Sequence, residues 1–165
     1  MTRYTTFSTA TLGTIYATLD GDSLSGIYFE GGRHAPPIAM DWRLDRGATP
    51  FRALEEQLHE YLAGERRAFE LALAARGTPF QRRVWAQIAR IPFGETITYT
   101  QLAARAGASD AMRAAGAATG RNPLSIVVPC HRVLGSGGSL TGYAGGLERK
   151  RRLLELEGAL QPALA

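Results

Sequence analysis

The chain changes its pattern near Arg76-Gly77-Thr78-Pro79, and this change limits the folds that it can adopt. Before this point apolar and polar residues alternate, which is typical of half-buried β-strands, whereas short helical repeats separated by turn residues follow it. A length of 165 residues allows one domain or two small ones with a real hydrophobic core. We therefore predict an α/β protein with a boundary here, between residues 1–76 and residues 77–165.

The first part is predicted to be a small sheet domain whose motifs are structural. Two alternating runs, residues 12–19 and 24–29, flank the turn signal Asp20-Gly21-Asp22, which predicts a β-hairpin. A short strand around residues 40–44 and a helix over residues 51–62, ended by Gly64, complete the domain. His34 and His59 have no partners at metal-ligand spacing, so we expect both at the surface.

The second part is predicted to contain a helix-turn-helix. A first helix spans residues 80–91, and Thr98-Tyr99-Thr100-Gln101 has the spacing of a capping box for a short helix that ends at Gly107. Ser109 or Asp110 is then placed to cap a second short helix over residues 111–119. Two short helices joined by a glycine-containing turn are typical of this DNA-binding motif.

The second helix of this pair is nearly bare. Alanine and glycine occupy most of its positions, and Arg113 is its main long polar side chain. Such a helix offers few hydrogen bonds to base edges, but it can approach a DNA groove closely and insert one arginine. The structural alternative is a small-residue helix packed in a core, with Arg113 in solvent.

Charge is distributed unevenly between the two parts. Residues 1–76 hold eight Arg/Lys and ten Asp/Glu, whereas residues 77–165 hold eleven Arg/Lys and five Asp/Glu. The basic second part favours polyanionic partners, although a merely solvated basic surface would give the same count. Lys150 is the only lysine among 19 basic residues, which indicates a position where a guanidinium cannot replace an ammonium group.

The chain has one cysteine, Cys130, which ends an apolar run over residues 124–128 and directly precedes His131. One thiol cannot form an internal disulfide or a multi-thiolate metal site, which leaves a buried structural residue or a nucleophile. The sequence shows no export signal and no apolar stretch long enough to cross a bilayer. We therefore expect a cytoplasmic protein.

The last predicted helix, residues 147–157 closed by Gly158, places charged residues where apolar ones belong. Lys150 and Glu157 share the stripe of Leu153 and Leu154 that should face inward. Glu157 also lies at the helix end where the dipole disfavours a negative charge. A partner such as His131 would explain this carboxylate, and so would a simple exposed helix end.

Together these residues resemble those of the O6-alkylguanine-DNA alkyltransferases, also called methylated-DNA–protein-cysteine methyltransferases. The motifs that carry the resemblance, in family order and spacing, are Phe80-Gln81 with Val84-Trp85, Ile91-Pro92-Phe93-Gly94-Glu95-Thr96, Tyr99, Leu102-Ala103, Arg113-Ala114-Ala115-Gly116, Asn122-Pro123, Pro129-Cys130-His131-Arg132-Val133, Gly142-Tyr143-Ala144-Gly145-Gly146 and Lys150 to Gly158. The resemblance is dense over residues 77–158 and loose over residues 1–76. It implies an α/β fold in which a ribonuclease-H-like antiparallel-sheet domain precedes a winged-helix-like domain carrying the helix-turn-helix.

The resemblance implies a DNA repair reaction in which Cys130 takes an alkyl group from guanine by in-line displacement and is not regenerated. His131 would reach Cys130 through a water, and Glu157 would orient the imidazole. Asn122 would brace the turn between the recognition helix and the active-site strand.

The family also has residues that act on the base and on the DNA. Tyr99 would help to flip the nucleotide and would protonate the departing guanine, with Lys150 supporting it, while Arg113 would fill the gap in the duplex from the minor groove. The further residues expected at the DNA are Gln81, Thr100, Ala111, Gly116, Arg121 and Ser136. The residues expected at the substrate pocket are Pro129, Val133, Tyr143 and Ala144, the last through its backbone N–H.

The implied partner is double-stranded DNA containing O6-alkylguanine, bound by a monomer without a membrane; activity on O4-alkylthymine and cooperative binding stay open. Ala115 and Ala144 stand where valine and serine are usual, and Thr141 lies where some members have glycine, which bears on the width of the pocket and on the alkyl groups that it accepts. The first part has no cysteine at the zinc-ligand positions of some members. We therefore predict no metal and no other cofactor.

Two other functions fit parts of the sequence. A non-catalytic module that flags alkylated bases would share the DNA-binding features, but the non-transferring relatives replace the cysteine that this chain keeps. A Cys-His hydrolase would need direct contact between Cys130 and His131, whereas neighbours in an extended segment point to opposite faces.

Overall fold

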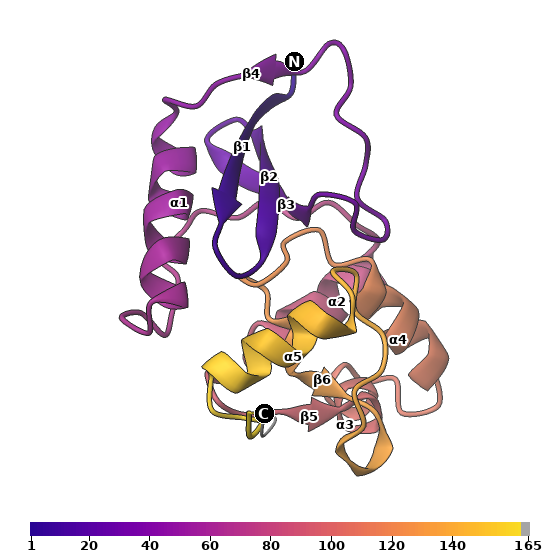
Figure 1. The fold of residues 1–165 in the computed structure, drawn as a ribbon. Helices are drawn as coiled ribbons and strands as arrows, with labels where there is room; N and C mark the ends of the chain where they lie inside the picture. Colours follow the sequence, from indigo (N-terminus) through magenta and orange to yellow (C-terminus); the bar gives the residue numbers. More distant parts are fainter. Residues whose placement is uncertain (163–165) are drawn as a thin grey trace.

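The computed structural model describes residues 1–162 and confirms the α/β fold class (Figure 1). The first part is a four-stranded sheet with the order β3-β2-β1-β4, formed by β1 (Arg3–Thr9), β2 (Gly13–Asp20), β3 (Ser23–Phe29) and β4 (Arg43–Leu44). The predicted hairpin is confirmed as the antiparallel pair β2 and β3. β1 is antiparallel to β2, whereas the short β4 runs parallel to β1 and makes the sheet mixed.

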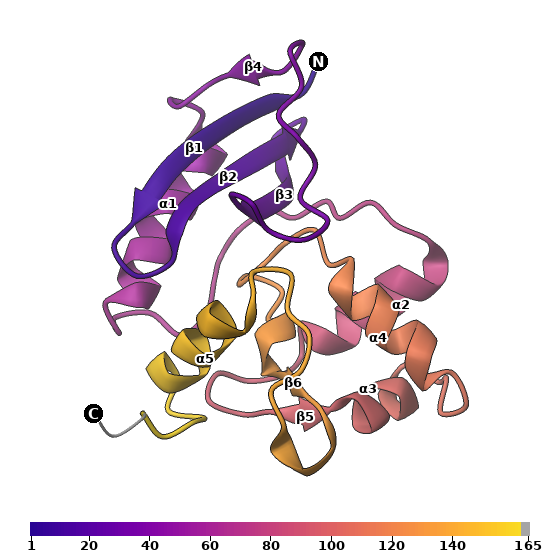
Figure 2. The ribbon, with the colours of Figure 1, turned by 45° about the vertical axis from the view of Figure 1, so that its right-hand side comes forward.

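One helix covers one face of this sheet. Helix α1 (Thr49–Leu62) presents Phe51, Leu54, Leu58 and Tyr61 inward, at the spacing that predicted it, and Gly64 follows in the left-handed conformation. The chain leaves β3 at one edge of the sheet and enters β4 at the opposite edge, so residues 30–42 pass across the sheet (Figure 2). His34 and His59 are exposed, as expected.

The second part consists of short helices around a small parallel sheet. Its elements are α2 (Pro79–Ile88), β5 (Ile97–Thr98), α3 (Tyr99–Arg105), α4 (Met112–Gly120), the 3-10 turns η1 (Cys130–Arg132) and η2 (Ser136–Gly138), β6 (Val133–Leu134) and α5 (Leu147–Leu156). The helix-turn-helix is α3 and α4, and the predicted capping box between Thr98 and Gln101 is present. A second capping box, between Thr78 and Gln81, opens α2.

The predicted cap of α4 is wrong. Ala111 occupies the N-cap position and makes no side-chain hydrogen bond, while Ser109 and Asp110 lie before it. The backbone N–H of Ala111 donates to the Ala108 carbonyl at 2.8 Å, which closes a turn over these two residues and leaves them outside the helix. Helix α4 therefore begins without the side-chain cap that the sequence predicts.

The apolar run 124–128 is not the strand that was expected. Leu124 forms an isolated bridge with Ile27 of β3, and turns follow, with Ile126 at a φ of 72°. Cys130 and His131 then begin η1 instead of lying in an extended segment, because the Arg132 N–H donates to the Pro129 carbonyl at 2.9 Å. The argument that an extended backbone separates their side chains therefore does not apply.

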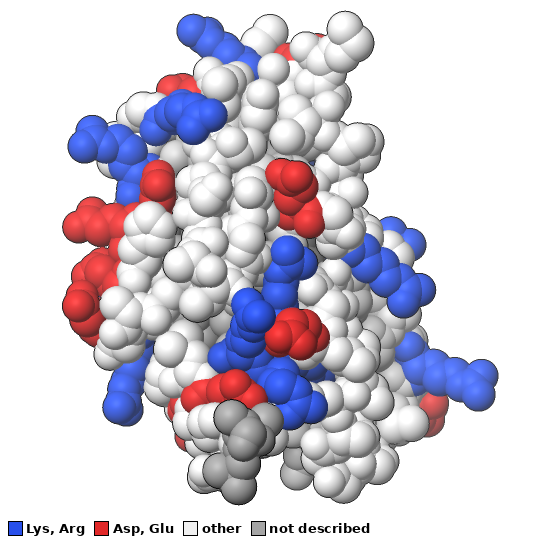
Figure 3. Space-filling view, in the orientation of Figure 1, with Lys and Arg blue, Asp and Glu red and all other residues white. Residues whose placement is uncertain are grey.

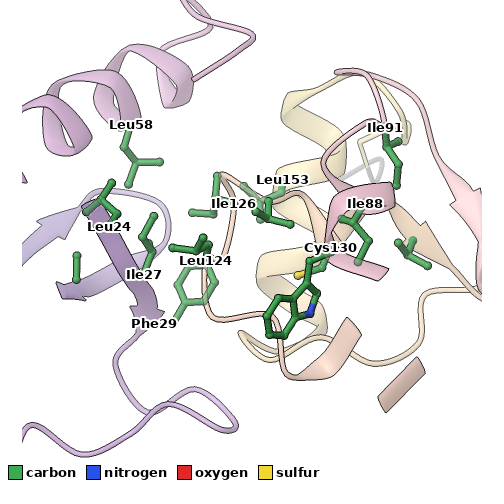
Figure 4. Close-up of a cluster of buried hydrophobic side chains, with 14 of the residues drawn as sticks. Leu24, Ile27, Phe29, Leu58, Ile88, Ile91, Leu124, Ile126, Cys130 and Leu153 are labelled. Carbon is green, nitrogen blue, oxygen red and sulfur yellow. The ribbon is translucent and has the colours of Figure 1, made fainter. Parts of the chain in front are cut away.

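The two parts share one hydrophobic core. In Figure 4, Leu124 and Ile126 lie between the sheet residues Leu24 and Ile27 and a group that includes Cys130, Ile88 and Leu153. The backbone also joins here, because the Ile27 N–H donates to the Pro123 carbonyl at 2.8 Å. The division into domains at residues 1–76 and 77–165 therefore stays a prediction. Within residues 1–162, no helix has the length and apolar character needed to span a membrane.

Charged side chains are unevenly distributed over the surface. Figure 3 shows acidic side chains along the side formed by α1 and basic ones over α5 and toward α4, with further basic side chains near β4 and acidic ones beside those of α5. The exposed arginines of the second part include Arg113 and Arg121 at the two ends of α4. The surface of the helix-turn-helix thus presents positive charge.

Candidate active site

Cys130 lines a cavity of about 340 Å³ to which both parts of the chain contribute. Of the residues predicted for the site, Tyr99, Gly116, Arg121, Tyr143 and Ala144 line the same cavity. Arg33 and His34, from the segment that follows β3, form part of its wall and were not predicted. A loop of the first part carries no sequence signal for this place, because only the tertiary packing brings it to the second part.

The thiol of Cys130 is buried and 4% exposed. Burial raises its pKa, while a hydrogen bond with the Asn122 side chain and the charge of Lys150 act in the opposite direction without overcoming burial. Asn122 also braces the preceding turn, since its Nδ2 donates to the Val128 carbonyl at 2.8 Å and its Oδ1 accepts from the Leu124 N–H at 3.0 Å. The resting residue is a thiol, so a nucleophilic role requires a base.

The base next to it is a fully buried histidine. His131 Nε2 lies 2.9 Å from Glu157 Oε2, and burial lowers the pKa of the imidazole, so the ring is neutral at neutral pH. Because a carboxylate only accepts hydrogen bonds, Nε2 must carry the hydrogen and Nδ1 must be the acceptor. Within the described residues Nδ1 has no hydrogen-bond partner, which leaves it able to accept a proton.

Glu157 is held by more groups than the sequence indicated. Arg132 donates to both carboxylate oxygens, from Nε to Oε1 and from Nη2 to Oε2, each at 2.8 Å, and Tyr61 donates to Oε2 at 2.6 Å. Burial tends to raise the pKa of Glu157, but the hydrogen bonds from His131, Arg132 and Tyr61 outweigh it and lower the pKa to about 2. Glu157 is therefore an ionised buried carboxylate and not an exposed helix end.

The Ile91-Pro92-Phe93-Gly94 motif contacts both members of the ion pair between Arg132 and Glu157. Arg132 Nη1 donates to the Ile91 carbonyl at 2.6 Å, and its guanidinium carbon lies 5.8 Å from the centre of the Phe93 ring. Gly94 has a φ of 82°, and a Cβ there would lie 3.2 Å from the Glu157 carbonyl oxygen. The motif thus fixes the backbone and the cation that hold the carboxylate.

Lys150 is fully buried and bound by backbone carbonyls. Its Nζ donates to Val133 at 2.7 Å, to Thr141 at 2.8 Å and to Gly142 at 3.2 Å. Three donors of a compact ammonium meet three acceptors, which a planar guanidinium cannot reproduce, so the single lysine has a geometric reason. Burial lowers the pKa of Lys150 to about 8, although the nearby Cys130 acts to raise it.

The link between Lys150 and Tyr99 is indirect. Nζ lies 5.9 Å from the centre of the Tyr99 ring, and the Tyr99 hydroxyl donates instead to the Thr141 carbonyl at 3.3 Å. The same carbonyl receives the shorter hydrogen bond from Lys150. Lys150 therefore positions the loop on which Tyr99 rests, and the long Tyr99 hydrogen bond leaves that hydroxyl free to find another acceptor.

The other predicted pocket residues have different positions. Tyr143 and Ala144 line the cavity, whereas Pro129 and Val133 are buried and their carbonyls accept hydrogen bonds from Arg132 and Lys150. Of the three departures from the family pattern, Ala115 is buried in the core, Thr141 is exposed outside the cavity, and only Ala144 lines the cavity.

Five of the residues predicted to bind DNA surround a second hollow of about 370 Å³ beside α3 and α4. They are Tyr99, Thr100, Arg113, Gly116 and Ser136. The others lie elsewhere: Arg121 lines the cysteine cavity, Ala111 is the N-cap of α4, and the Gln81 side chain accepts from the Thr78 N–H. Because Tyr99 and Gly116 line both hollows, the thin helix α4 connects the expected DNA surface with Cys130.

The packing of α4 explains why most of its side chains are small. Ala115 and Ala118 are buried, and the Trp85 indole of α2 donates to the Ala118 carbonyl at 2.8 Å, while Arg113, Ala114 and Ala117 are exposed. The packing interpretation is therefore confirmed on one face of the helix, while close approach to DNA by the exposed face stays a prediction. Among residues 1–162, no three His, Cys, Asp or Glu side chains are grouped as a metal site would need.

Comparison with known proteins agrees with this arrangement. The family described as 6-O-methylguanine DNA methyltransferase, DNA binding domain, matches residues 79–159. A methylated-DNA–protein-cysteine methyltransferase of Mycobacterium tuberculosis is 50% identical over 127 residues, which cover 77% of this chain and 76% of that protein. One of Methanosarcina acetivorans is 43% identical over 148 residues, which cover 90% of this chain and 94% of that protein.

A solved structure extends the likeness to the fold. The crystal structure of Mycobacterium tuberculosis OGT in complex with DNA has a TM-score of 0.87 at 42% identity, with 94% of this chain and 92% of that chain covered. Identity and coverage of this extent show that the chain belongs to the methylated-DNA–protein-cysteine methyltransferases.

Proposed function

We propose that this chain, as a monomer, repairs O6-alkylguanine in double-stranded DNA by transferring the alkyl group irreversibly to its own Cys130. The observation that carries the proposal is the single cysteine of the chain, which lines a cavity and precedes a buried histidine bound to an ionised carboxylate. Membership of the family supports the same reaction.

The first step is removal of the thiol proton. His131 is neutral and presents Nδ1 as an acceptor, so a water molecule between the two side chains can carry the proton from Cys130 to the imidazole. Glu157 remains ionised and stabilises the imidazolium that forms.

In the second step the thiolate attacks the alkyl carbon opposite the guanine oxygen. A C–S bond forms while the C–O bond breaks, and the electron pair of the C–O bond goes to the guanine. Burial and the nearby Cys130 raise the pKa of Tyr99, so its hydroxyl holds a proton that it can give to the departing base. The imidazolium of His131 then gives up the former thiol proton through solvent, and the Tyr99 phenolate takes one up. Overall the thiol exchanges hydrogen for an alkyl group and guanine gains the proton, which leaves a stable thioether and limits each molecule to one turnover.

Helix α4 suits the delivery of a base into this cavity. Its exposed face of alanines permits close approach to a groove, and the exposed Arg113 near its start can occupy the space of an extruded nucleotide. Gly116 and Tyr99 lie between this face and Cys130. A flipped base therefore has a short path from the duplex to the thiol.

The proposal is tested by intact-mass measurement after incubation with a duplex that carries one O6-methylguanine. We expect a permanent gain of one methyl group per molecule on Cys130, and Cys130→Ser should bind the same duplex nearly as tightly without any gain. An unchanged mass of the wild type with tight binding would indicate a lesion-binding module instead. Repeated turnover without a mass change would indicate a hydrolase.

A further inference from the structure

We propose that Tyr61, on helix α1 of the first part, is a positioning residue of the alkyl-transfer site that acts through Glu157. The inference rests on the proposed function for its consequence in repair, but not for its geometry. It gives the first part of the chain a share in the chemistry of Cys130.

Tyr61 reaches Glu157 across 96 positions of sequence. The phenol is 1% exposed, and its hydroxyl donates to Glu157 Oε2 at 2.6 Å in a buried contact. Its ring is held by Phe69 of the first part, with ring centres 5.3 Å apart, and by Phe93 of the second part, edge to face at 6.2 Å. Contacts on both sides fix the direction of the hydroxyl without using its hydrogen-bonding capacity.

The hydrogen bond bears on the oxygen that holds His131. Glu157 Oε2 accepts from Tyr61, His131 and Arg132, whereas Oε1 accepts from Arg132. Arg132 fixes the plane of the carboxylate, and Tyr61 adds a donor to the oxygen that faces the imidazole. Each extra donor makes that oxygen a weaker proton acceptor, so the proton that leaves Cys130 stays on the imidazole.

The donor can act in one direction only. Burial and the charge of Glu157 raise the pKa of Tyr61 beyond the usual range of a phenol, so Tyr61 donates at every pH at which the protein works. The groups that face this carboxylate are Tyr61 from α1, His131 and Arg132 from η1, and Tyr143, whose pKa the charges of Cys130 and Glu157 raise. Lys150 acts on Cys130 and His131.

The test compares wild type with Tyr61→Phe, which keeps the ring packing and removes the hydroxyl. Two rates are measured across pH: methyl transfer from a duplex with one O6-methylguanine, and alkylation by iodoacetamide of Cys130, the only thiol of the chain. We expect the highest transfer rate to fall about tenfold because Oε2 is held less firmly. Since Glu157 becomes more basic, it stabilises the imidazolium more, and the pH profile of Cys130 alkylation should move to lower pH.

A matched control separates this role from packing. Tyr4→Phe removes a phenol of the same sheet domain whose ring packs on Trp42, at a distance of 6.1 Å between centres, and should change neither rate nor profile. A slower Tyr61→Phe with an unmoved pH profile would mean that Tyr61 is only structural, which overturns the proposal.

Coupling to Glu157 gives a second criterion. In a Glu157→Gln background, adding Tyr61→Phe should lower the rate of methyl transfer by less than about twofold, because the group through which Tyr61 acts is gone. Fully additive losses would overturn the proposal. If wild type gains no methyl group from DNA while the alkylation profile still shifts in Tyr61→Phe, the proposed function fails and the assignment of Tyr61 stands. If wild type transfers and Tyr61→Phe equals it in both measurements, the assignment of Tyr61 fails.

Discussion

At the scale of single residues, the geometry around Lys150 explains why this position holds the only lysine of the chain. Its three hydrogen bonds to the Val133, Thr141 and Gly142 carbonyls need a compact ammonium at full burial. We expect Lys150→Arg to slow methyl transfer at least about tenfold, by displacing the loop under Tyr99, with DNA affinity nearly unchanged. Single-turnover rates and binding to the same duplex measure the two effects.

The exposed neighbour Arg151 provides the control for Lys150→Arg. Arg151→Lys makes the reverse exchange outside the core and should leave the transfer rate at the wild-type value. Because Tyr99 and Lys150 share the Thr141 carbonyl, adding Lys150→Arg to Tyr99→Phe should cost little further. A wild-type rate for Lys150→Arg would show that the three carbonyls do not position the loop.

Arg113 should matter only when a base stack must be opened. Its side chain is exposed at the start of α4 and lines the hollow beside α3 and α4, not the cysteine cavity. We expect Arg113→Ala to slow repair of duplex DNA by about tenfold or more, while the reaction of Cys130 with the free modified base keeps the wild-type rate. Equal losses on both substrates would contradict a role in flipping.

The sequence predicted the central residues of the site but not all their partners. Cys130 and His131 stand out by their adjacency, and Glu157 by its place on an apolar stripe near a helix end. Arg132 and Tyr61 were missed, because an arginine in a motif and a tyrosine at helical spacing have ordinary structural explanations. The available signal was weak: a buried tyrosine needs a partner for its hydroxyl, but the sequence does not say which.

At the scale of elements, two capping boxes of the same composition allow a paired test. Thr98 caps α3, whose first residue is Tyr99, and Thr78 caps α2. We expect Thr98→Ala and Thr78→Ala each to lower the free energy of unfolding by about 1 kcal/mol, measured in urea. Only Thr98→Ala should also slow the reaction with the free modified base, since only that cap orients Tyr99. Equal slowing by both variants would mean that stability alone sets the rate.

Helices and strands were predicted well where the buried face carries only apolar residues, and poorly where polar residues share that face. The β2–β3 hairpin and α1 have clear periodicity, whereas the buried face of β1 is Thr5, Phe7 and Thr9, so its alternation is hidden by threonine. The run 124–128 is apolar because it lies between the two parts and not because it is a strand. A continuous apolar run indicates burial but not backbone conformation.

At the scale of the whole molecule, the buried relay should make stability depend on pH. Burial lowers the pKa of His131, so the unfolded chain binds a proton more readily and stability falls as pH drops below about 6.5. The pKa of Glu157 is lowered from 4.5 to about 2, so a second loss of about 3 kcal/mol follows between these values as the carboxylate is protonated. Urea unfolding at several pH values measures both losses.

The control for this pH dependence is Glu157→Gln. This variant should be less stable at neutral pH, because it leaves Arg132 buried without its counter-ion. Its stability should nevertheless change less between about pH 5 and pH 2 than that of wild type, since the group that titrates there is absent. An equally steep decline in both proteins would place the acid sensitivity elsewhere.

The path of residues 30–42 has a consequence for loop engineering. This connection must cross from the β3 edge of the sheet to the β4 edge, and on the way Arg33 and His34 form part of the cysteine cavity, with the Arg33 N–H bound to the Ala144 carbonyl at 2.8 Å. Surface loops usually tolerate insertions and deletions. Here the two ends of the connection are fixed at opposite edges of the sheet, and its middle is hydrogen-bonded to Ala144. A deletion within residues 30–42 would therefore displace Arg33 and His34 and change the wall of the cysteine cavity.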